Sequence, residues 1–195
     1  GVLVSEPGEH PAQLGEVGPG PPGRPDEDAR ERVTLDAHPL RLGDRHFRIY
    51  HPGKAHTDGD LMVEVVEEKL MFLGDIVVAH RAARLDDGDF KGNIAAIDAA
   101  LKSKAVHFVP GHGLSGGREI PLGYRAFLSS LYGSVKKYYT QGLTDFDMKD
   151  RVNKDLAAYQ QWAMFDTGLG RLISLAYLQA EAEAAGAIVL RGRRV

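Results

Sequence analysis

The sequence of 195 residues contains no cysteine, no long apolar run and no large excess of charge of either sign. The absence of cysteine excludes disulfides, thiolate nucleophiles, cysteine-ligated zinc and iron–sulfur clusters. No run approaches the roughly 18 apolar residues of a membrane-spanning helix, so we expect a soluble protein with no membrane partner. A net charge of −3 gives no general attraction to nucleic acid. Eight histidines and the Asp and Glu residues remain for chemistry or metal binding.

The first part of the chain is rich in residues that disfavour regular structure. Six of the ten prolines lie within the first 25 residues, with glycines between them. Proline removes a backbone donor and glycine is costly to order, so we predict a linker-like segment over residues 1–32. The missing cysteines do not decide between a cytoplasmic and a periplasmic protein, and the localisation stays open.

From residue 33 the hydrophobic pattern predicts folded structure. Residues 45–50 alternate polar and apolar side chains, which is typical of a strand with one buried face, and residues 61–73 form a plausible hairpin. A helix is expected near residues 94–101 and a short strand over residues 106–109. Strands, one helix and one further strand predict an α/β or α+β domain over residues 33–120.

The remainder of the chain, residues 121–195, is predicted to be a helical extension. Its apolar spacing and its glycines predict three helices over residues 122–139, 144–165 and 172–185. Gly168 and Gly170 are expected to interrupt the pattern between the second and the third helix. The aromatic side chains of this extension are more easily explained as core packing than as a substrate pocket.

Three residues share one structural context in this pattern. His56 lies in a polar loop before a strand, Asp75 follows a strand, and His112 follows a strand within Pro-Gly-His-Gly. Loops at the ends of strands often carry binding groups, because the sheet holds them rigidly while they stay accessible. Two imidazoles and a carboxylate are also ligands that zinc accepts. Each signal alone is weak, since most loop histidines are structural or exposed.

The joint pattern over residues 33–117 resembles the second half of a metallo-β-lactamase-fold hydrolase. The resemblance rests on the His-Thr loop at residues 55–61, the hairpin after it, Gly74-Asp75, and Val-Pro-Gly-His-Gly at residues 109–113. It implies an αββα sandwich, of which this chain would supply half, followed by the helical extension. It also implies a zinc-dependent hydrolase that attacks a small ester, thioester or lactam with a metal-bound hydroxide.

Carried over to this sequence, the resemblance gives each candidate a role. His56 would be a terminal ligand of one zinc ion, Asp75 would bridge two, and His112 would be a terminal ligand of the second. Asp58 and Asp60 are not ligands in this pattern. Either could anchor the His56 loop or orient a ring nitrogen from behind the ligands, although both are more simply explained as turn formers. No catalytic residue beyond these is assigned.

The sequence departs from the family pattern in one serious respect. The signature His-x-His-x-Asp-His, which supplies four metal-binding residues in such proteins, does not occur. Because the chain also begins with glycine, we expect it to be the C-terminal portion of a longer sequence. Three ligands shared between two metals leave each one short, so we predict partial or absent zinc and weak or no activity. The missing N-terminal half, or an oligomer partner, would have to cover the exposed sheet.

Two functions from different classes therefore remain open. The first is a zinc hydrolase acting on a small molecule. Some relatives that hydrolyse antibiotics have cysteine at the position of Asp75, so the carboxylate there favours general hydrolysis over antibiotic hydrolysis. The second is a non-catalytic fragment or split half that acts through association with a partner chain. Convergence of His56, Asp75 and His112 would favour the first, and a large exposed apolar surface would favour the second.

Overall fold

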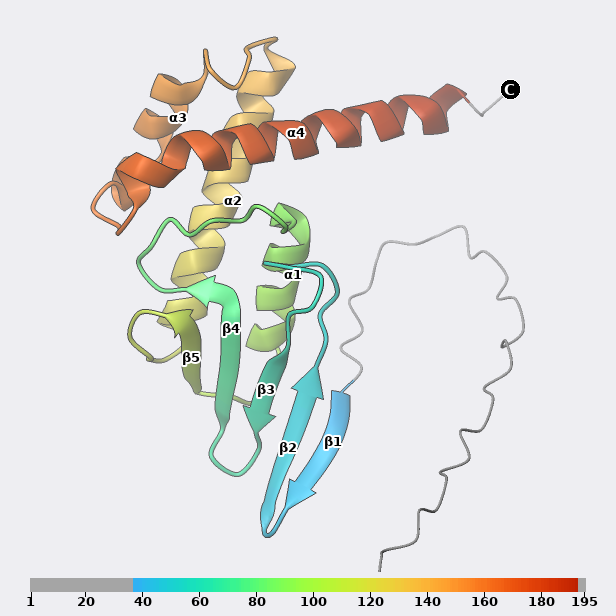
Figure 1. Cartoon of the computed structure of the whole chain (residues 1–195), viewed down its shortest axis with the longest axis vertical. Helices are drawn as coiled ribbons and strands as arrows, with labels where there is room; N and C mark the ends of the chain where they lie inside the picture. The colour runs from blue at the N-terminus through green and yellow to red at the C-terminus, as the bar shows by residue number, and fades with distance from the viewer. Residues whose placement is uncertain (1–36, 193–195) are drawn as a thin grey trace, which may run out of the picture. The chain divides into compact units, whose positions relative to one another are not determined.

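A computed structural model describes the backbone of residues 37–192 and the side chains of residues 37–186 (Figure 1). The linker-like segment predicted over residues 1–32 lies outside the described residues. The strands are β1 (Ala37–Leu42), β2 (Arg45–Tyr50), β3 (Met62–Val65), β4 (Leu70–Val78) and β5 (His107–His112). The helices are α1 (Phe90–Leu101), α2 (Glu119–Thr140), α3 (Lys149–Asp155) and α4 (Phe165–Gly192), with a short 3-10 helix at Ala157–Tyr159. This part of the chain is a mixed α/β structure.

The five strands form one mixed sheet in the order β1-β2-β3-β4-β5. The first four strands pair antiparallel in chain order, whereas β5 pairs parallel to β4 after the chain crosses over through α1. The strands predicted over residues 45–50 and 61–73 are confirmed, and the second hairpin strand continues to Val78. Because β4 and β5 are parallel, their carboxyl ends meet at the same edge of the sheet.

Helices α1 and α2 cover one face of this sheet. The alternation along β4 places Met71 and Leu73 on that face, where both are fully buried, and Phe108 of β5 lies opposite Met71. Phe127 and Leu128 of α2 belong to the same buried core. Figure 1 shows both helices behind the strands, so the core lies between the sheet and this pair of helices.

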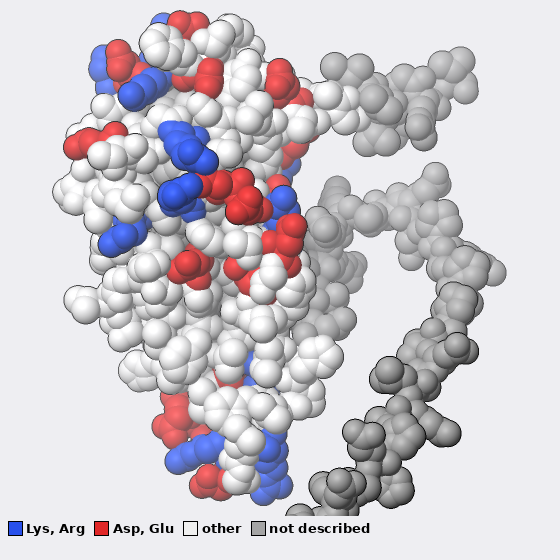
Figure 2. Space-filling model, in the orientation of Figure 1, with Lys and Arg blue, Asp and Glu red and all other residues white. Residues whose placement is uncertain are grey.

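The other face of the sheet, which we call the open face, carries a row of apolar side chains across four strands. Ile49, Val63, Phe72 and Val109 are register neighbours in this row. Phe72 is 43% exposed, and the other three are only half-buried. Figure 2 shows this side of the molecule as largely uncharged between charged groups at its two ends. An apolar surface of this kind is typical of a face that packs against another element.

The helical extension differs from its prediction in the middle. The helix predicted over residues 122–139 is confirmed as α2, but the one predicted over residues 144–165 is wrong, because only the short α3 and the 3-10 helix form there. The physical reason is a tertiary pairing at Ala163. Its N–H donates to the carbonyl oxygen of His80 and its carbonyl oxygen accepts from the N–H of Ala82, so it is held in an extended bridge.

The last helix begins earlier than predicted. Gly168 and Gly170 lie inside α4 and do not interrupt it. A Cβ atom at Gly168 would lie 3.2 Å from the carbonyl oxygen of Ala82, so glycine allows α4 to approach the loop after β4 closely. Leu172 and Ile173 of α4 are buried in the core that α2 also lines. Within the described residues, no helix is both long and apolar enough to cross a membrane.

Candidate metal centre

The carboxyl ends of β4 and β5 bring Asp75 and His112 together. Val78 of β4 pairs with His112 in the parallel register, and Asp75 lies three residues earlier on the same strand. The Nε2 atom of His112 is 3.5 Å from Oδ1 of Asp75. The side chains are 54% and 43% exposed, so both stay open to solvent or to a ligand. The crossover topology, which joins residues 37 positions apart, therefore creates a histidine–carboxylate pair.

The two glycines around His112 are required by this close approach. A Cβ atom at Gly111 would lie 2.8 Å from the backbone nitrogen of Asp75 and closer still to its carboxylate. Gly113 has a φ of +91°, and a Cβ atom there would lie 2.8 Å from the carbonyl oxygen of Ala79. Only glycine adopts this geometry without strain, so Pro-Gly-His-Gly is the sequence that lets β5 lie tightly against β4 at the site.

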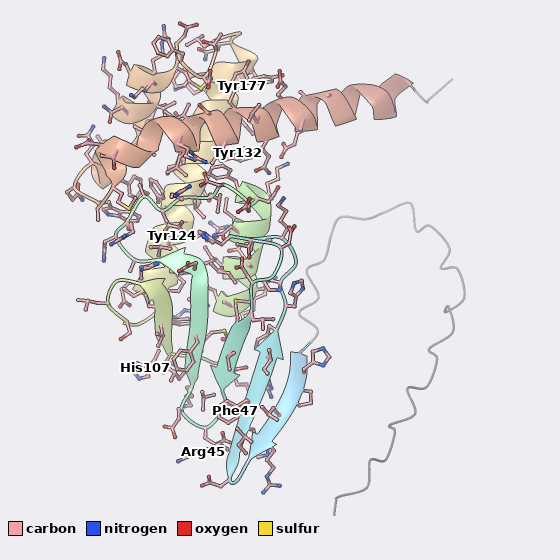
Figure 3. All side chains as sticks on the ribbon, in the orientation of Figure 1. Arg45, Phe47, His107, Tyr124, Tyr132 and Tyr177 are labelled. Carbon is pink, nitrogen blue, oxygen red and sulfur yellow. The ribbon has the colours of Figure 1, made fainter. Side chains whose placement is uncertain are left out.

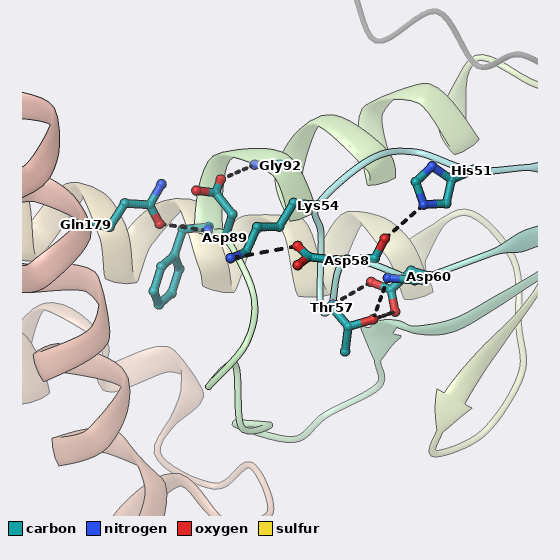
Figure 4. A network of polar contacts seen from close by, with 10 residues as sticks. His51, Lys54, Thr57, Asp58, Asp60, Asp89, Gly92 and Gln179 are labelled. Atoms are coloured by element: carbon teal, nitrogen blue, oxygen red, sulfur yellow. Dashed lines mark hydrogen bonds and ion pairs between the residues drawn. The ribbon is translucent and has the colours of Figure 1, made fainter. Parts of the chain in front are cut away.

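The loop that carries His56, residues 51–61, is held by polar contacts at both sides (Figure 4). The backbone N–H and the hydroxyl of Thr57 donate to Asp60, at 2.8 and 2.9 Å. On the other side, the N–H of Asp89 donates to the carbonyl oxygen of Ala55 at 2.8 Å. Asp60 therefore anchors the His56 loop from within, and the start of α1 anchors it from outside.

Asp58, the other acidic residue of this loop, lies at its surface. Its carboxylate is 81% exposed and lies 3.8 Å from Lys54, and its carbonyl oxygen is 2.9 Å from Nε2 of His51. An exposed pair at this distance contributes little to stability. Of the two aspartates considered from the sequence, Asp60 is the one that the structure places in contact with the backbone next to His56.

A single cavity of about 320 Å³ is lined by all three predicted ligands. His56 reaches it from its loop, and Asp75 and His112 reach it from the sheet edge. The other lining residues are Val78, Arg81, Ala83, Arg84 and Met164. Three residues that are far apart in the sequence thus meet around one space, which is large enough for a small ligand.

The donors of this cavity fit zinc in kind but not in number. His112 and Asp75 supply nitrogen and oxygen ligands, and Nδ1 of His56 is a buried polar atom without a hydrogen-bond partner. A buried unpartnered nitrogen is costly unless something occupies it, such as a ligand, an ion or a water. Within residues 37–186, however, no group of three histidine or acidic side chains is arranged to hold an ion. A catalytic zinc has three protein ligands, and the described residues do not bring three together in a geometry that would hold one ion.

Tyr124 of α2 is a further polar group beside this site. Its hydroxyl is buried and has no hydrogen-bond partner among the described residues. Burial, and in second place the negative charge of Asp75, raise the pKa of the Tyr124 phenol, so it stays a neutral donor. Figure 3 shows it near the end of β4. From the sequence, core packing was the simpler explanation for the aromatic residues of this extension and a substrate pocket the alternative, because nothing in the spacing of Tyr124 shows where its hydroxyl lies.

The arginines of the cavity were also missed from the sequence. Arg81 and Arg84 lie six and nine residues after Asp75, on the loop that leaves the same strand. This proximity to the strand end is a signal that could have been used. It is a weak one, because a loop can turn its side chains either way.

The family described as Metallo-beta-lactamase superfamily matches residues 2–112. Among solved structures, a metallo-beta-lactamase from Pontibacter korlensis is 26% identical, with a TM-score of 0.45, over 48% of this chain and 46% of that one. VMB-1 and the DIM-1 metallo-beta-lactamase are each 22% identical over 43% of this chain and 41% of theirs, with TM-scores of 0.41 and 0.39.

This chain thus spans less than half the length of these solved structures. No curated protein matches it. The family match covers more than half of the chain and includes His56, Asp75 and His112. It also begins earlier than the resemblance seen over residues 33–117. The chain therefore belongs to the metallo-beta-lactamase superfamily.

Proposed function

We propose that this chain supplies part of the active site of a zinc-dependent hydrolase that acts on a small ester, thioester or lactam. The observation that carries the proposal is the meeting of His56, Asp75 and His112 around one cavity, with the His112 and Asp75 side chains 3.5 Å apart. The remaining ligands would come from outside the described residues.

The chain's own residues would have distinct tasks in such a site. His56, His112 and the Asp75 carboxylate would be the zinc ligands that this chain supplies. Zinc held there would supply a water of lowered pKa as the nucleophile and would polarise the substrate carbonyl. Asp60 would keep His56 in place through Thr57, and Gly111 would keep the Asp75 carboxylate beside His112. Tyr124 would offer a neutral hydrogen-bond donor beneath the site.

Zinc binding by the 195-residue chain and its variants tests this proposal. We expect weak binding, which His56→Ala or His112→Ala lowers by about tenfold or more. His107→Ala is the matched control, since His107 is exposed at the far end of the same strand (Figure 3). Equilibrium dialysis with metal analysis gives the affinities. Tight stoichiometric zinc binding that neither site variant reduces would show that the metal lies elsewhere.

The open face favours a second candidate function, that of a split half. Ile49, Val63, Phe72 and Val109 form an apolar row that no described element buries fully. In this proposal, the remainder of the metallo-β-lactamase-like domain, on the same or another chain, covers this row. Sedimentation of the chain alone and with that remainder tests it. A chain that stays monomeric with the remainder present, and binds zinc fully by itself, would contradict it.

A further inference from the structure

Two buried polar atoms near the start of α1 have no hydrogen-bond partner within the described residues, and they complement each other. One is Nδ1 of His56 and the other is Oδ1 of Asn93. An imidazole nitrogen that carries a proton is a donor, whereas an amide oxygen can only accept. Buried polar groups in folded proteins almost always have a partner. An unpaired donor and an unpaired acceptor in one region therefore indicate a link between the two.

Helix α1 brings Asn93 to the loop that carries His56. The N–H of Asp89 donates to the carbonyl oxygen of Ala55 at 2.8 Å, and the carbonyl oxygen of Asp89 accepts from the N–H of Asn93 at 2.9 Å. A Cβ atom at Gly92 would overlap a carbonyl oxygen of the same loop, so the first turn of α1 lies directly against it (Figure 4). The Asn93 side chain is fully buried here.

The amide of Asn93 is oriented by the strand that carries Asp75. Its Nδ2 atom donates to the carbonyl oxygen of Ile76, the next residue along β4, at 2.8 Å. Because a carbonyl group can only accept, the amide nitrogen must face Ile76, and Oδ1 is left on the other side of the amide. Asn93 therefore bonds to one segment that carries a candidate ligand and packs against the other.

The ring of His56 has two nitrogens in different surroundings. Nδ1 is enclosed, whereas Nε2 is not, and the ring lines the cavity of the candidate metal centre. A histidine ligand binds metal through its unprotonated nitrogen and almost always donates its other N–H to a neighbouring group, which fixes the tautomer and the ring orientation. Nε2 is thus the nitrogen open to a ligand in the cavity, and Nδ1 is the one that needs an acceptor.

We propose that Asn93 is a positioning residue for His56, and that its Oδ1 atom holds the Nδ1 proton of His56 through one enclosed water. The two atoms form no direct hydrogen bond, and a water between them satisfies both. The link keeps the proton off Nε2, so the ring is ready for a metal before the metal arrives. This inference rests on the proposed hydrolase function, since it deepens the account of the same site.

The position of the ring proton in the metal-free chain tests the inference without any need for turnover. Long-range nitrogen–proton correlation NMR spectra of the full chain, labelled at histidine, show which ring nitrogen carries the proton. They are recorded with a chelator at about pH 9, above the ordinary titration range of histidine. His56→Gln identifies the signals by their loss. We expect the proton on Nδ1, and a proton on Nε2 in the wild-type chain would overturn the proposal.

Variants assign the effect to Asn93. Asn93→Leu has a similar shape and no acceptor, so it should move the proton toward Nε2 and weaken zinc binding about tenfold. Asn93→Asp retains an oxygen at this position and should keep the proton on Nδ1. Tyr124→Phe is the matched control for the ring proton, because it also removes an unpartnered buried polar atom, but from α2. A proton that stays on Nδ1 in Asn93→Leu, or leaves it in Tyr124→Phe, would overturn the assignment.

A second control separates positioning from stability. Asn93→Leu also removes the hydrogen bond to Ile76, so a loss of stability by itself could loosen the site. Ser134→Ala removes a buried bond of 2.6 Å to Asp155, between α2 and α3. It should lower stability and leave the His56 proton and the zinc affinity unchanged. A displaced proton in Ser134→Ala as well would show that the proton reports general loosening, and would overturn the role of Asn93.

The outcome also separates this inference from the function on which it rests. A chain that holds the proton on Nδ1 of His56 but never binds zinc would retain the positioning role and lose the hydrolase proposal. Zinc bound through Nδ1 of His56, with the proton on Nε2, would do the reverse.

Discussion

The edge of the sheet that carries the candidate metal centre and the open face of the same sheet are built in opposite ways. At the edge, Gly111 and Gly113 permit β5 to lie close to β4, and Asp60 anchors the loop that carries His56. The backbone hydrogen bonds of Ala163 fix the loop that follows β4. On the open face, apolar side chains at consecutive register positions remain half-buried or exposed. The described residues therefore contain what orders the edge, whereas they leave the apolar row of the open face incompletely covered.

The largest expected effect at the candidate metal centre is at Gly111, where the two strands of the edge approach most closely. Gly111→Ala should lower the free energy of unfolding by about 3 kcal/mol, because the new methyl group overlaps the backbone and carboxylate of Asp75. Gly133→Ala is the matched control. It has open space in the interior of α2, so it should raise stability by about 0.5–1 kcal/mol. Urea denaturation measures both, and equal effects would show that the strands do not meet as described.

The anchor of the His56 loop gives the next effect. Asp60→Ala removes two hydrogen bonds to Thr57 and should cost about 1–2 kcal/mol of stability. It should also weaken zinc binding about tenfold, since His56 is no longer held in place. Asp58→Ala, in the same loop but at its surface, should change stability by less than about 0.5 kcal/mol. If Asp58→Ala weakens zinc binding and Asp60→Ala does not, the roles given to the two aspartates are wrong.

Asp58 and Asp60 show the limit of what could be predicted from the sequence. The hydrophobic pattern and the resemblance placed Asp75 and His112 just after neighbouring strands. Both instead lie within the strands, because β4 continues to Val78 and β5 to His112, and both line one cavity with His56. The choice between Asp58 and Asp60 depended on the direction of a side chain in a loop, which no periodicity encodes. The helix expected over residues 144–165 was wrong because Ala163 forms hydrogen bonds with residues some 80 positions earlier. Such tertiary pairing overrides local propensity and leaves no local pattern.

A smaller, pH-dependent effect is expected where α4 meets α1 and α2. Burial alone would raise the pKa of the Glu183 carboxyl, but hydrogen bonds from Lys91, Tyr132 and Lys136 outweigh it and lower the pKa to about 2. The pKa of Glu183 in the folded protein lies below the ordinary value of 4.5. The stabilisation of the fold by the Glu183 carboxylate is therefore complete above pH 4.5 and is lost as the pH falls toward 2.

Glu183→Gln should therefore cost about 1 kcal/mol at pH 7 and progressively less below pH 4.5. Thermal unfolding of both proteins across this range measures the difference. Glu181→Gln is a control on the same helix, because Glu181 is exposed and has no ion pair among the described residues. A constant difference between Glu183→Gln and wild type at all pH values would show that the carboxylate charge contributes nothing. The contact of α4 with α1 and α2 would then not depend on that charge.

The smallest effect on the chain by itself is expected on the open face, and it sharpens the comparison most directly. Met71 and Phe72 are neighbours on β4 but point to opposite faces. Met71 is fully buried, whereas Phe72 is 43% exposed. Met71→Ala should cost about 3 kcal/mol, because it leaves a cavity beneath α1 and α2. Phe72→Thr, which keeps a strand-forming residue, should change the free energy of unfolding by less than about 0.5 kcal/mol. Its effect should instead appear in association with the remaining half of the domain, where a large apolar side chain is lost from the interface. Comparable losses for the two variants in the isolated chain would mean that both faces are already covered.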